Sequence, residues 1–395
     1  MAIQPRILRW ARETAGLSLD EAAQAIDLKE AHGKTGADRL AALEDGDVEP
    51  SRSQLLRMSK AYRRPLLVFY LNEPPRMGDR GQDFRTLPGQ QQFNADLDAL
   101  LRDIKARQGL IRSMLEDAEA TPLAFVGSAT SDTPVVRLAA RIEATIGFSR
   151  DEFRNTRTPD DAFTYLRSCI EAAGVFVLLL GNLGSHHTNI PVEIFRGFAL
   201  ADPIAPLIVI NDQDARSAWS FTALHEVVHL WLGATGISGE DASNAIEQYC
   251  NDVAGELLVP QSDLQSFTRL SVFDAAARAI TDRAKAFRVS RSMLAYKLHR
   301  VGLINRSVWA ALHEHFTKEW VLFKLRRAEK NKATEGGPSY YVVRRHRVGN
   351  ALLSLVRRSL DDGIITYTKA GRVLGVKPTN VEPLLSVLPF RGGQR

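Results

Sequence analysis

Apolar residues in the first 75 positions recur at helical spacing in short stretches separated by turns. This pattern predicts helices over Ile7–Ala15, after Ser18, over Ala37–Leu43 and after Pro50. Ser18 is followed three residues later by Glu21, the spacing of a capping box, in which each side chain accepts a hydrogen bond from the other residue's backbone N–H. We therefore expect residues 1–75 to form a compact helical domain.

The middle of the chain combines helical patterns with short apolar runs. After a proline-rich link, an apolar stripe over Ala95–Glu119 predicts a long helix, so we expect residues 76–135 to be a linker and that helix. Val175–Leu180 and Leu207–Ile210 are typical of buried strands, and Phe195–Leu200 is a candidate third strand. The predicted fold class is mainly α with a small α+β core.

Domain boundaries follow from these changes of pattern. We expect the α+β core and the helices after it to occupy residues 136–320. A basic linker and a small C-terminal helical segment are expected over residues 321–395, where Gly336-Gly-Pro338 interrupts the helical pattern.

Composition excludes several classes of protein. The chain has 395 residues, 45% of them apolar, and its longest apolar run, Val175–Leu180, is far shorter than the ~20 residues needed to cross a bilayer. Its first residues do not have the pattern of a signal peptide, so we expect none. Its two cysteines, Cys169 and Cys250, cannot build a disulfide framework or a four-cysteine zinc site. We expect a cytoplasmic protein whose metal site, if it has one, uses histidine and carboxylate ligands.

The net charge of +5 is unevenly distributed along the chain. Residues 282–395 carry 23 Lys and Arg against 8 Asp and Glu, a net +15, so the preceding residues carry −10. An acidic body with a basic tail indicates that the tail contacts nucleic acid or an acidic partner, or that it forms a solvated surface.

The residues His225-Glu-Val-Val-His229 are the strongest chemical signal. Two histidines four residues apart lie on one face of a helix, so both imidazoles can bind one Zn²⁺, and Glu226 is placed to act as a general base. Asp212 or Asp214 is expected to cap this helix, and Gly233 to end it.

A catalytic zinc site needs a third protein ligand, which we expect on the next helical pattern. There Ile246, Cys250, Val253 and Leu257 are predicted to form a core stripe, with Glu247 at its margin. The spacing favours Glu247 as the ligand, with Asp252 and Glu256 as competing carboxylates, and Cys250 is expected to be a core residue.

Taken together, His225-Glu-Val-Val-His229, Glu247-Gln-Tyr-Cys-Asn251 and Glu256-Leu-Leu-Val-Pro260 resemble the ImmA/IrrE family of zinc metallo-endopeptidases over about Ala139–Phe316. Phe195-Arg-Gly-Phe-Ala199 is also similar. The resemblance implies a zincin-like domain in which His225, His229 and Glu247 bind the metal and Glu226 is the general base. Members are typically bacterial or phage proteins that cleave or relieve a DNA-bound repressor.

The N-terminal residues resemble an XRE-type helix-turn-helix, a domain that commonly accompanies ImmA/IrrE domains. The similar residues are Leu8–Ser18, Ala22-Ala23 and Leu43-Glu-Asp-Gly46. Lys29–Thr35 are an apparent insertion, and residues 1–75 hold 11 basic and 11 acidic side chains, so this domain is neutral. The resemblance implies DNA binding, with Lys34 and Arg39 as candidate contacts; dimerisation or partner docking is the alternative.

A second stretch similar to a helix-turn-helix follows the metal motif. Residues 282–300 have the pattern of a helix, a turn and a helix that presents Arg291, Lys297 and Arg300 as candidate nucleic-acid contacts. Further basic residues follow up to Arg347, with Tyr340 and Tyr341 among them, and their charge and aromatic faces suit nucleic-acid binding. A solvated linker explains these residues about as well.

These observations favour a regulatory zinc metallo-endopeptidase that cleaves one protein, such as a repressor, an antitoxin or another neighbouring-gene product. Mn²⁺ is the alternative metal. The competing hypothesis is a DNA-binding or antitoxin-like regulator whose zinc domain senses a signal or binds a partner with little proteolysis. DNA and a second copy of the chain are further predicted partners. His186 and His187 are candidate donors to the oxyanion of a cleavage reaction.

Overall fold

The computed structural model describes residues 3–75, 91–185, 188–238, 245–267, 269–332 and 339–386, with backbone alone at 91–94, 266, 325 and 327–332. The chain divides into two compact units, Met1–Ile104 with Asn182–Ile194, and Lys105–Gly181 with Phe195–Arg395. The division falls inside the long helix α5 (Gln91–Asp117).

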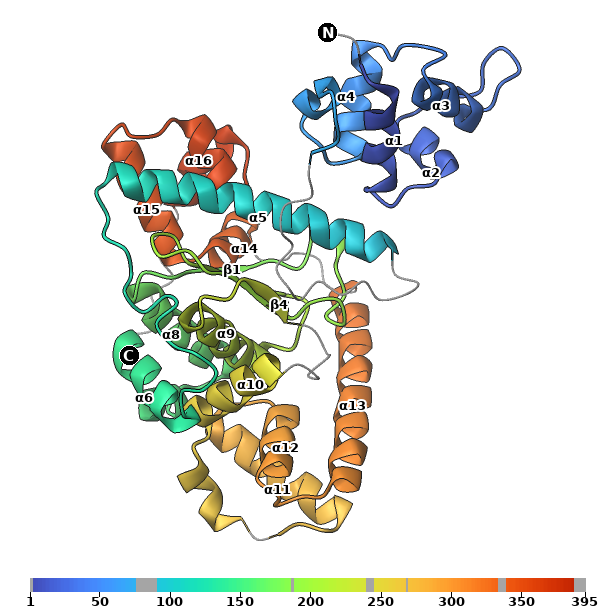
Figure 1. The fold of residues 1–395 in the computed structure, drawn as a ribbon. Coiled ribbons are helices and arrows are strands. Elements are labelled where there is room, and N and C mark those ends of the chain that lie inside the picture. The colour runs from blue at the N-terminus through green and yellow to red at the C-terminus, as the bar shows by residue number, and fades with distance from the viewer. Residues whose placement is uncertain are drawn as a thin grey trace. The chain divides into compact units, whose positions relative to one another are not determined.

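The first unit contains the helices expected near the N-terminus (Figure 1). They are α1 (Pro5–Glu13), α2 (Leu19–Ala25), α3 (Gly36–Asp45), α4 (Arg52–Ala61) and the 3₁₀ helix η1 (Leu66–Tyr70). Ser18 and Glu21 form the predicted capping box, and Thr35 with Asp38 and Ser51 with Gln54 form two more. Apolar side chains from all five elements form one core, so these short helices stabilise one another.

A four-stranded sheet in the order β1-β3-β2-β4 lies at the centre of the second unit. β1 (Phe176–Leu179) runs parallel to β3 (Leu207–Ile210), whereas β2 (Gly197–Leu200) is antiparallel to both β3 and β4 (Gly236–Ser238). Every residue of β1, β2 and β3 is buried, which explains their continuous apolar runs and confirms the three predicted strands. β4 was not predicted because its three residues carry no such run.

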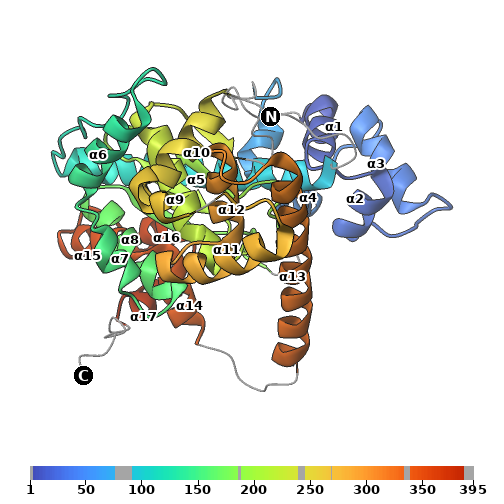
Figure 2. The same ribbon diagram turned by 90° about the horizontal axis from the view of Figure 1, so that it is seen from below.

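Helices share one core with this sheet, in agreement with the predicted fold class, mainly α with a small α+β core. Figure 2 shows α9 and α10 side by side, in agreement with their extensive contact. The helices are α6 (Val135–Ile146), α7 (Arg150–Arg154), α8 (Pro159–Ala172), α9 (Arg216–Trp231), α10 (Ala245–Leu258), η3 (Gln261–Ser266), α11 (Phe273–Phe287), α12 (Arg291–Arg300) and α13 (Arg306–Lys332). None of the described helices has both the length and the apolar character needed to cross a membrane.

The C-terminal segment is a small helical bundle packed on the sheet and on α8. It consists of α14 (Tyr340–Val348), α15 (Asn350–Asp361), α16 (Tyr367–Leu374), η4 (Pro378–Asn380) and α17 (Val381–Ser386), with α14 against β1 and α15 against α8. Gly336-Gly-Pro338, the predicted interruption, lies outside the described residues. Arg344 is buried and donates to the carbonyl oxygens of Leu374 and Gly375, so part of the basic excess of this segment serves its own fold.

A buried ion pair joins this bundle to the rest of the second unit. Arg167 on α8 donates to Glu171 at 3.0 Å and to the carbonyl oxygens of Val177 and His346. Glu171 in turn accepts hydrogen bonds from the backbone N–H groups of Asn350 and Ala351, each at 3.1 Å. The carboxylate therefore caps the first turn of α15, where the helix dipole favours a negative charge.

Replacing Arg167 by methionine is expected to destabilise the protein by about 3–5 kcal/mol, because Glu171 is left as a buried charge without its cation. Urea unfolding monitored by circular dichroism measures this loss. Arg112→Met is the matched control: its pairs with Glu116 and Asp202 are more exposed, so its expected cost is at most about 1 kcal/mol. Equal losses for the two variants would contradict the structural role assigned to Arg167.

Candidate metal centre

Helix α9 carries the two motif histidines and packs between the sheet, α8 and α10. It ends at Trp231 with Leu232 as the C-cap residue, and Gly233 follows with a φ of +65°, the left-handed conformation that glycine adopts without strain, as predicted. The predicted cap was wrong: the N-cap residue is Ala215, and no side chain caps the helix. Asp214 instead accepts hydrogen bonds from the Ala215 N–H and from Arg196, and Asp212 pairs with Arg347 of α14.

Three side chains from α9 and α10 converge in the interior. The Nε2 atom of His225 lies 3.1 Å from Glu247 Oε2 and 3.1 Å from the Nε2 atom of His229, which is itself 3.1 Å from Glu247 Oε1. All three residues are at most 6% exposed. Within the described ranges, this is the one cluster of three or more such side chains with the geometry to hold a metal ion.

The separations within this cluster fit a small divalent metal. Ligand bonds of 2.0–2.2 Å in a tetrahedral site place neighbouring donor atoms about 3.3–3.6 Å apart, close to the separations seen here. Two imidazole nitrogens and one carboxylate oxygen also form the donor set of several catalytic zinc sites. The residues present therefore fit Zn²⁺, although this donor set does not distinguish it from Mn²⁺.

The electrostatics of the cluster also suit a cation. Burial raises the pKa of Glu247, but hydrogen bonds from His225 and His229 outweigh burial and lower that pKa to about 2. Burial lowers the pKa of His229, yet its contacts with Cys250 and Glu247 more than compensate and raise it well above the ordinary value. An ionised carboxylate is thus held between two imidazoles, and a positive charge is favoured at this position.

Helix α10 presents Glu247 because its buried face points toward α9. Cys250, Val253 and Leu257 are fully buried as predicted, but Ile246, in the first turn, is 40% exposed and does not belong to the core stripe. Burial raises the pKa of the Cys250 thiol, which favours the protonated form over the thiolate that binds metals. Cys250 thus fits the core role expected for it.

The two competing carboxylates of α10 are engaged elsewhere. Glu256 accepts a hydrogen bond from Lys297 at 2.7 Å, and Asp252 pairs with Arg300 at 2.6 Å. Both partners lie on α12, on another side of α10 from the metal cluster. The structure therefore brings Glu247, and neither of its competitors, to the two histidines.

Glu226, the candidate general base, is completely buried on α9. Its carboxylate lies against the start of β2, where Gly197 leaves room for it. It is also close enough to His229 to raise the pKa of that imidazole. Its position next to the metal cluster is what proton transfer at the cluster requires. His186 and His187, the candidate oxyanion donors, lie outside the described residues.

The three candidate nucleic-acid contacts on α12 all have acidic partners. Lys297 is only 8% exposed, so its ammonium group is committed to Glu256 and faces the protein interior. Arg300 pairs with Asp252, and Arg291 pairs with Glu319 at 2.7 Å while covering the ring of Phe316. Arg291 and Arg300 retain partly exposed side chains, and a role for them in binding DNA stays a prediction.

Of the N-terminal candidates, Lys34 is exposed and Arg39 is half-buried. Arg39 donates to the carbonyl oxygen of Lys29 at 2.5 Å, which ties the apparent insertion to α3. DNA binding by this unit likewise stays a prediction.

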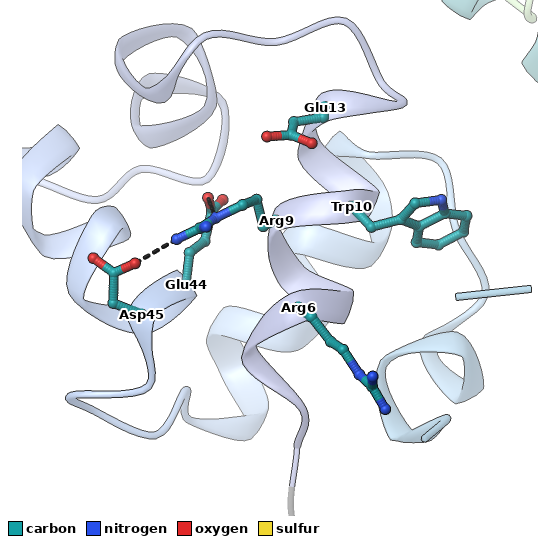
Figure 3. A pocket seen from close by; sticks show the side chains of 6 residues that line it. All are labelled: Arg6, Arg9, Trp10, Glu13, Glu44 and Asp45. Atoms are coloured by element: carbon teal, nitrogen blue, oxygen red, sulfur yellow. Dashed lines mark hydrogen bonds and ion pairs between the residues drawn. The ribbon is translucent and has the colours of Figure 1, made fainter. Parts of the chain in front are cut away.

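The same unit has a pocket of about 360 Å³ (Figure 3). It is lined by Arg6, Arg9, Trp10, Glu13, Glu44 and Asp45. Figure 3 shows Arg9 directed toward Glu44 and Asp45, with Arg6 and Trp10 pointing away from them. Glu44 also accepts two hydrogen bonds from Arg12, so the acidic groups of the pocket are compensated by arginines of the same unit.

Comparison with known protein families gave one result for this region. Residues 182–299 match the family model of the IrrE N-terminal-like domain, Peptidase M78. Searches of curated proteins and of solved structures found no match. The matched residues include all three members of the metal cluster and Glu226, so a metallopeptidase-type domain carries the cluster. The match does not reach residues 1–75, whose resemblance to an XRE-type domain stays a prediction.

Proposed function

We propose that this chain is a zinc-dependent endopeptidase in which His225, His229 and Glu247 hold the metal and Glu226 is the general base. The observation that carries the proposal is the position of the buried Glu226 carboxylate beside a three-donor cluster. A purely structural metal site needs no such base, since its ligands alone complete it. The match of residues 182–299 to a peptidase family supports the same reaction.

Each residue of the site would have its own role in peptide hydrolysis. When bound, Zn²⁺ supplies Lewis acidity, which polarises a peptide carbonyl and makes water a stronger acid. Glu226 accepts the proton of the attacking water at its carboxylate and passes it to the amine of the departing peptide. His225, His229 and Glu247 keep the metal next to this carboxylate, and the surrounding apolar core excludes other water from it.

The substrate we propose is one specific protein, such as a repressor, an antitoxin or another product of a neighbouring gene. The resemblance of residues 1–75 to a regulatory domain and the basic excess after residue 282 support a role in transcriptional or stress control.

One observation favours a second function. The members of the metal cluster and Glu226 are at most 6% exposed, so they offer a peptide very little accessible surface. Burial of this kind suits a regulator whose zinc domain senses a signal or binds a partner with little proteolysis.

Two assays on the full chain distinguish these functions. The zinc-loaded protein is incubated with internally quenched peptides of mixed sequence and with purified neighbouring-gene products, with and without the chelator dipicolinic acid. If the protein is a zinc-dependent protease, it binds about one zinc per chain, and the chelator abolishes a cleavage that added zinc restores. Neighbouring products that are bound but never cut, together with a gel shift of the protein's own promoter, would instead establish the regulator.

A further inference from the structure

Gly197 occupies an unusual place for a glycine. It is the first residue of β2, buried in the sheet and paired with Ile210 of β3 and Ser238 of β4. Its φ is not positive, so the backbone there accepts any residue. A glycine inside a strand weakens the strand, because it has no side chain to pack and loses more backbone freedom on folding. Backbone conformation therefore does not explain this glycine.

The space beside Gly197 is filled by two side chains of α9. A Cβ atom at position 197 would lie 2.8 Å from Oε1 and 3.1 Å from Cγ of Glu226, and 2.7 Å from Cγ2 of Thr222. Cβ atoms essentially never approach other heavy atoms within 3.0 Å. Thr222 and Glu226 are one helical turn apart, so this face of α9 rests directly on the backbone of β2.

From this contact we infer that Gly197 is a positioning residue for Glu226: its missing side chain provides the space in which the carboxylate is held beside the metal cluster. The inference rests on the proposed function. With a methyl group at position 197, Oε1 would have to withdraw by about 0.6 Å to reach 3.4 Å, the beginning of ordinary van der Waals contact. A misplacement of about 1 Å in a reacting group costs on the order of 10²-fold in rate.

Gly197→Ala tests the inference on the full-length zinc-loaded protein, with the most readily cleaved quenched peptide as the probe. We expect kcat to fall roughly 10²-fold while KM changes by less than about threefold, because the general base moves and peptide binding does not. Zinc affinity, measured by competition with a chelator, is expected to stay unchanged, since the three atoms nearest to a Cβ at position 197 belong to Thr222 and Glu226 and not to a ligand. Ile208→Val in β3 is the matched control, which loosens the same sheet and keeps the wild-type kcat.

A double-mutant cycle separates displacement of Glu226 from a general disturbance of α9. Glu226→Ala removes both Cγ and the carboxylate, so the added methyl group meets neither, and Gly197→Ala then causes a much smaller further loss of the residual kcat. The same cycle, read as the thermal midpoint of the metal-free protein, gives coupling between positions 197 and 226 without any activity. Full rescue of Gly197→Ala by Thr222→Ser, which removes only the threonine methyl group, would overturn the inference.

The remaining outcomes separate this inference from the proposed function. If the wild-type protein cleaves and Gly197→Ala cleaves equally well, the inference fails and the proposed function stands. If the wild-type protein cleaves nothing, the proposed function fails and the inference falls with it, and a thermal coupling between the two positions then reports packing alone.

Discussion

Glu226→Gln is expected to retain about one zinc per chain and to lower peptide cleavage roughly 10²–10⁴-fold, the usual contribution of a general base. Glutamine has nearly the same shape and fits the same buried space against Gly197, but its amide cannot accept the proton of the attacking water. Metal analysis and single-turnover cleavage of the quenched peptides measure the two quantities separately.

The control for this variant is Glu116→Gln, which changes an exposed glutamate on α5 that pairs with Arg112, and for which we expect wild-type zinc content and wild-type cleavage. A Glu226→Gln protein that holds zinc and cleaves at the wild-type rate would exclude Glu226 as the base. If the variant also lost its zinc, Glu226 would have to support the ligands as well, contrary to the cluster of three seen here.

Glu247→Ala is expected to weaken zinc binding by more than roughly 100-fold and to abolish cleavage. Residues that only hydrogen-bond to metal ligands already contribute up to roughly 100-fold to metal affinity, and a direct ligand contributes more. The substitution removes the only carboxylate of the cluster and leaves two buried imidazoles facing each other at 3.1 Å. Zinc affinity follows from competition with chelators of graded strength, and the fold is checked by circular dichroism.

The matched control is Asp252→Asn, which changes the next acidic residue of the same helix. Asp252 is paired with Arg300 and lies away from the two histidines, so its variant is expected to bind zinc as the wild type does. Equal losses of zinc affinity in the two variants would mean that α10 as a whole, rather than Glu247, holds the metal.

Much of the site could be predicted because its signals are local. The spacing of His225 and His229 places both side chains on one face of any helix that contains them. The stripe of Cys250, Val253 and Leu257 indicates which face of the next helix is buried, and Glu247 lies at its margin. Strands β1 and β3 were recognisable because a strand buried on both faces must be apolar throughout.

Other features depend on contacts between distant residues and left no local signal. Lys297 has the pattern of a nucleic-acid contact, yet it is buried against Glu256, because α12 packs on α10. The sequence of the C-terminal bundle predicts a basic tail, although Arg344 donates to a backbone carbonyl within the bundle and Arg347 pairs with Asp212. Gly197 was part of a family-like stretch, but its role follows only from the side chains of α9 that rest on it.

The sequence by itself determined the local part of the candidate metal site: His225, Glu226 and His229 at fixed helical spacing, since the geometry of a helix is set by its own backbone. Only the tertiary structure decided which of three carboxylates on α10 joins them. It also decided which cations stay exposed, and how Glu226 is held. Each of those outcomes depends on the packing of one element against another, and the free energy of packing depends on residues far apart in the chain.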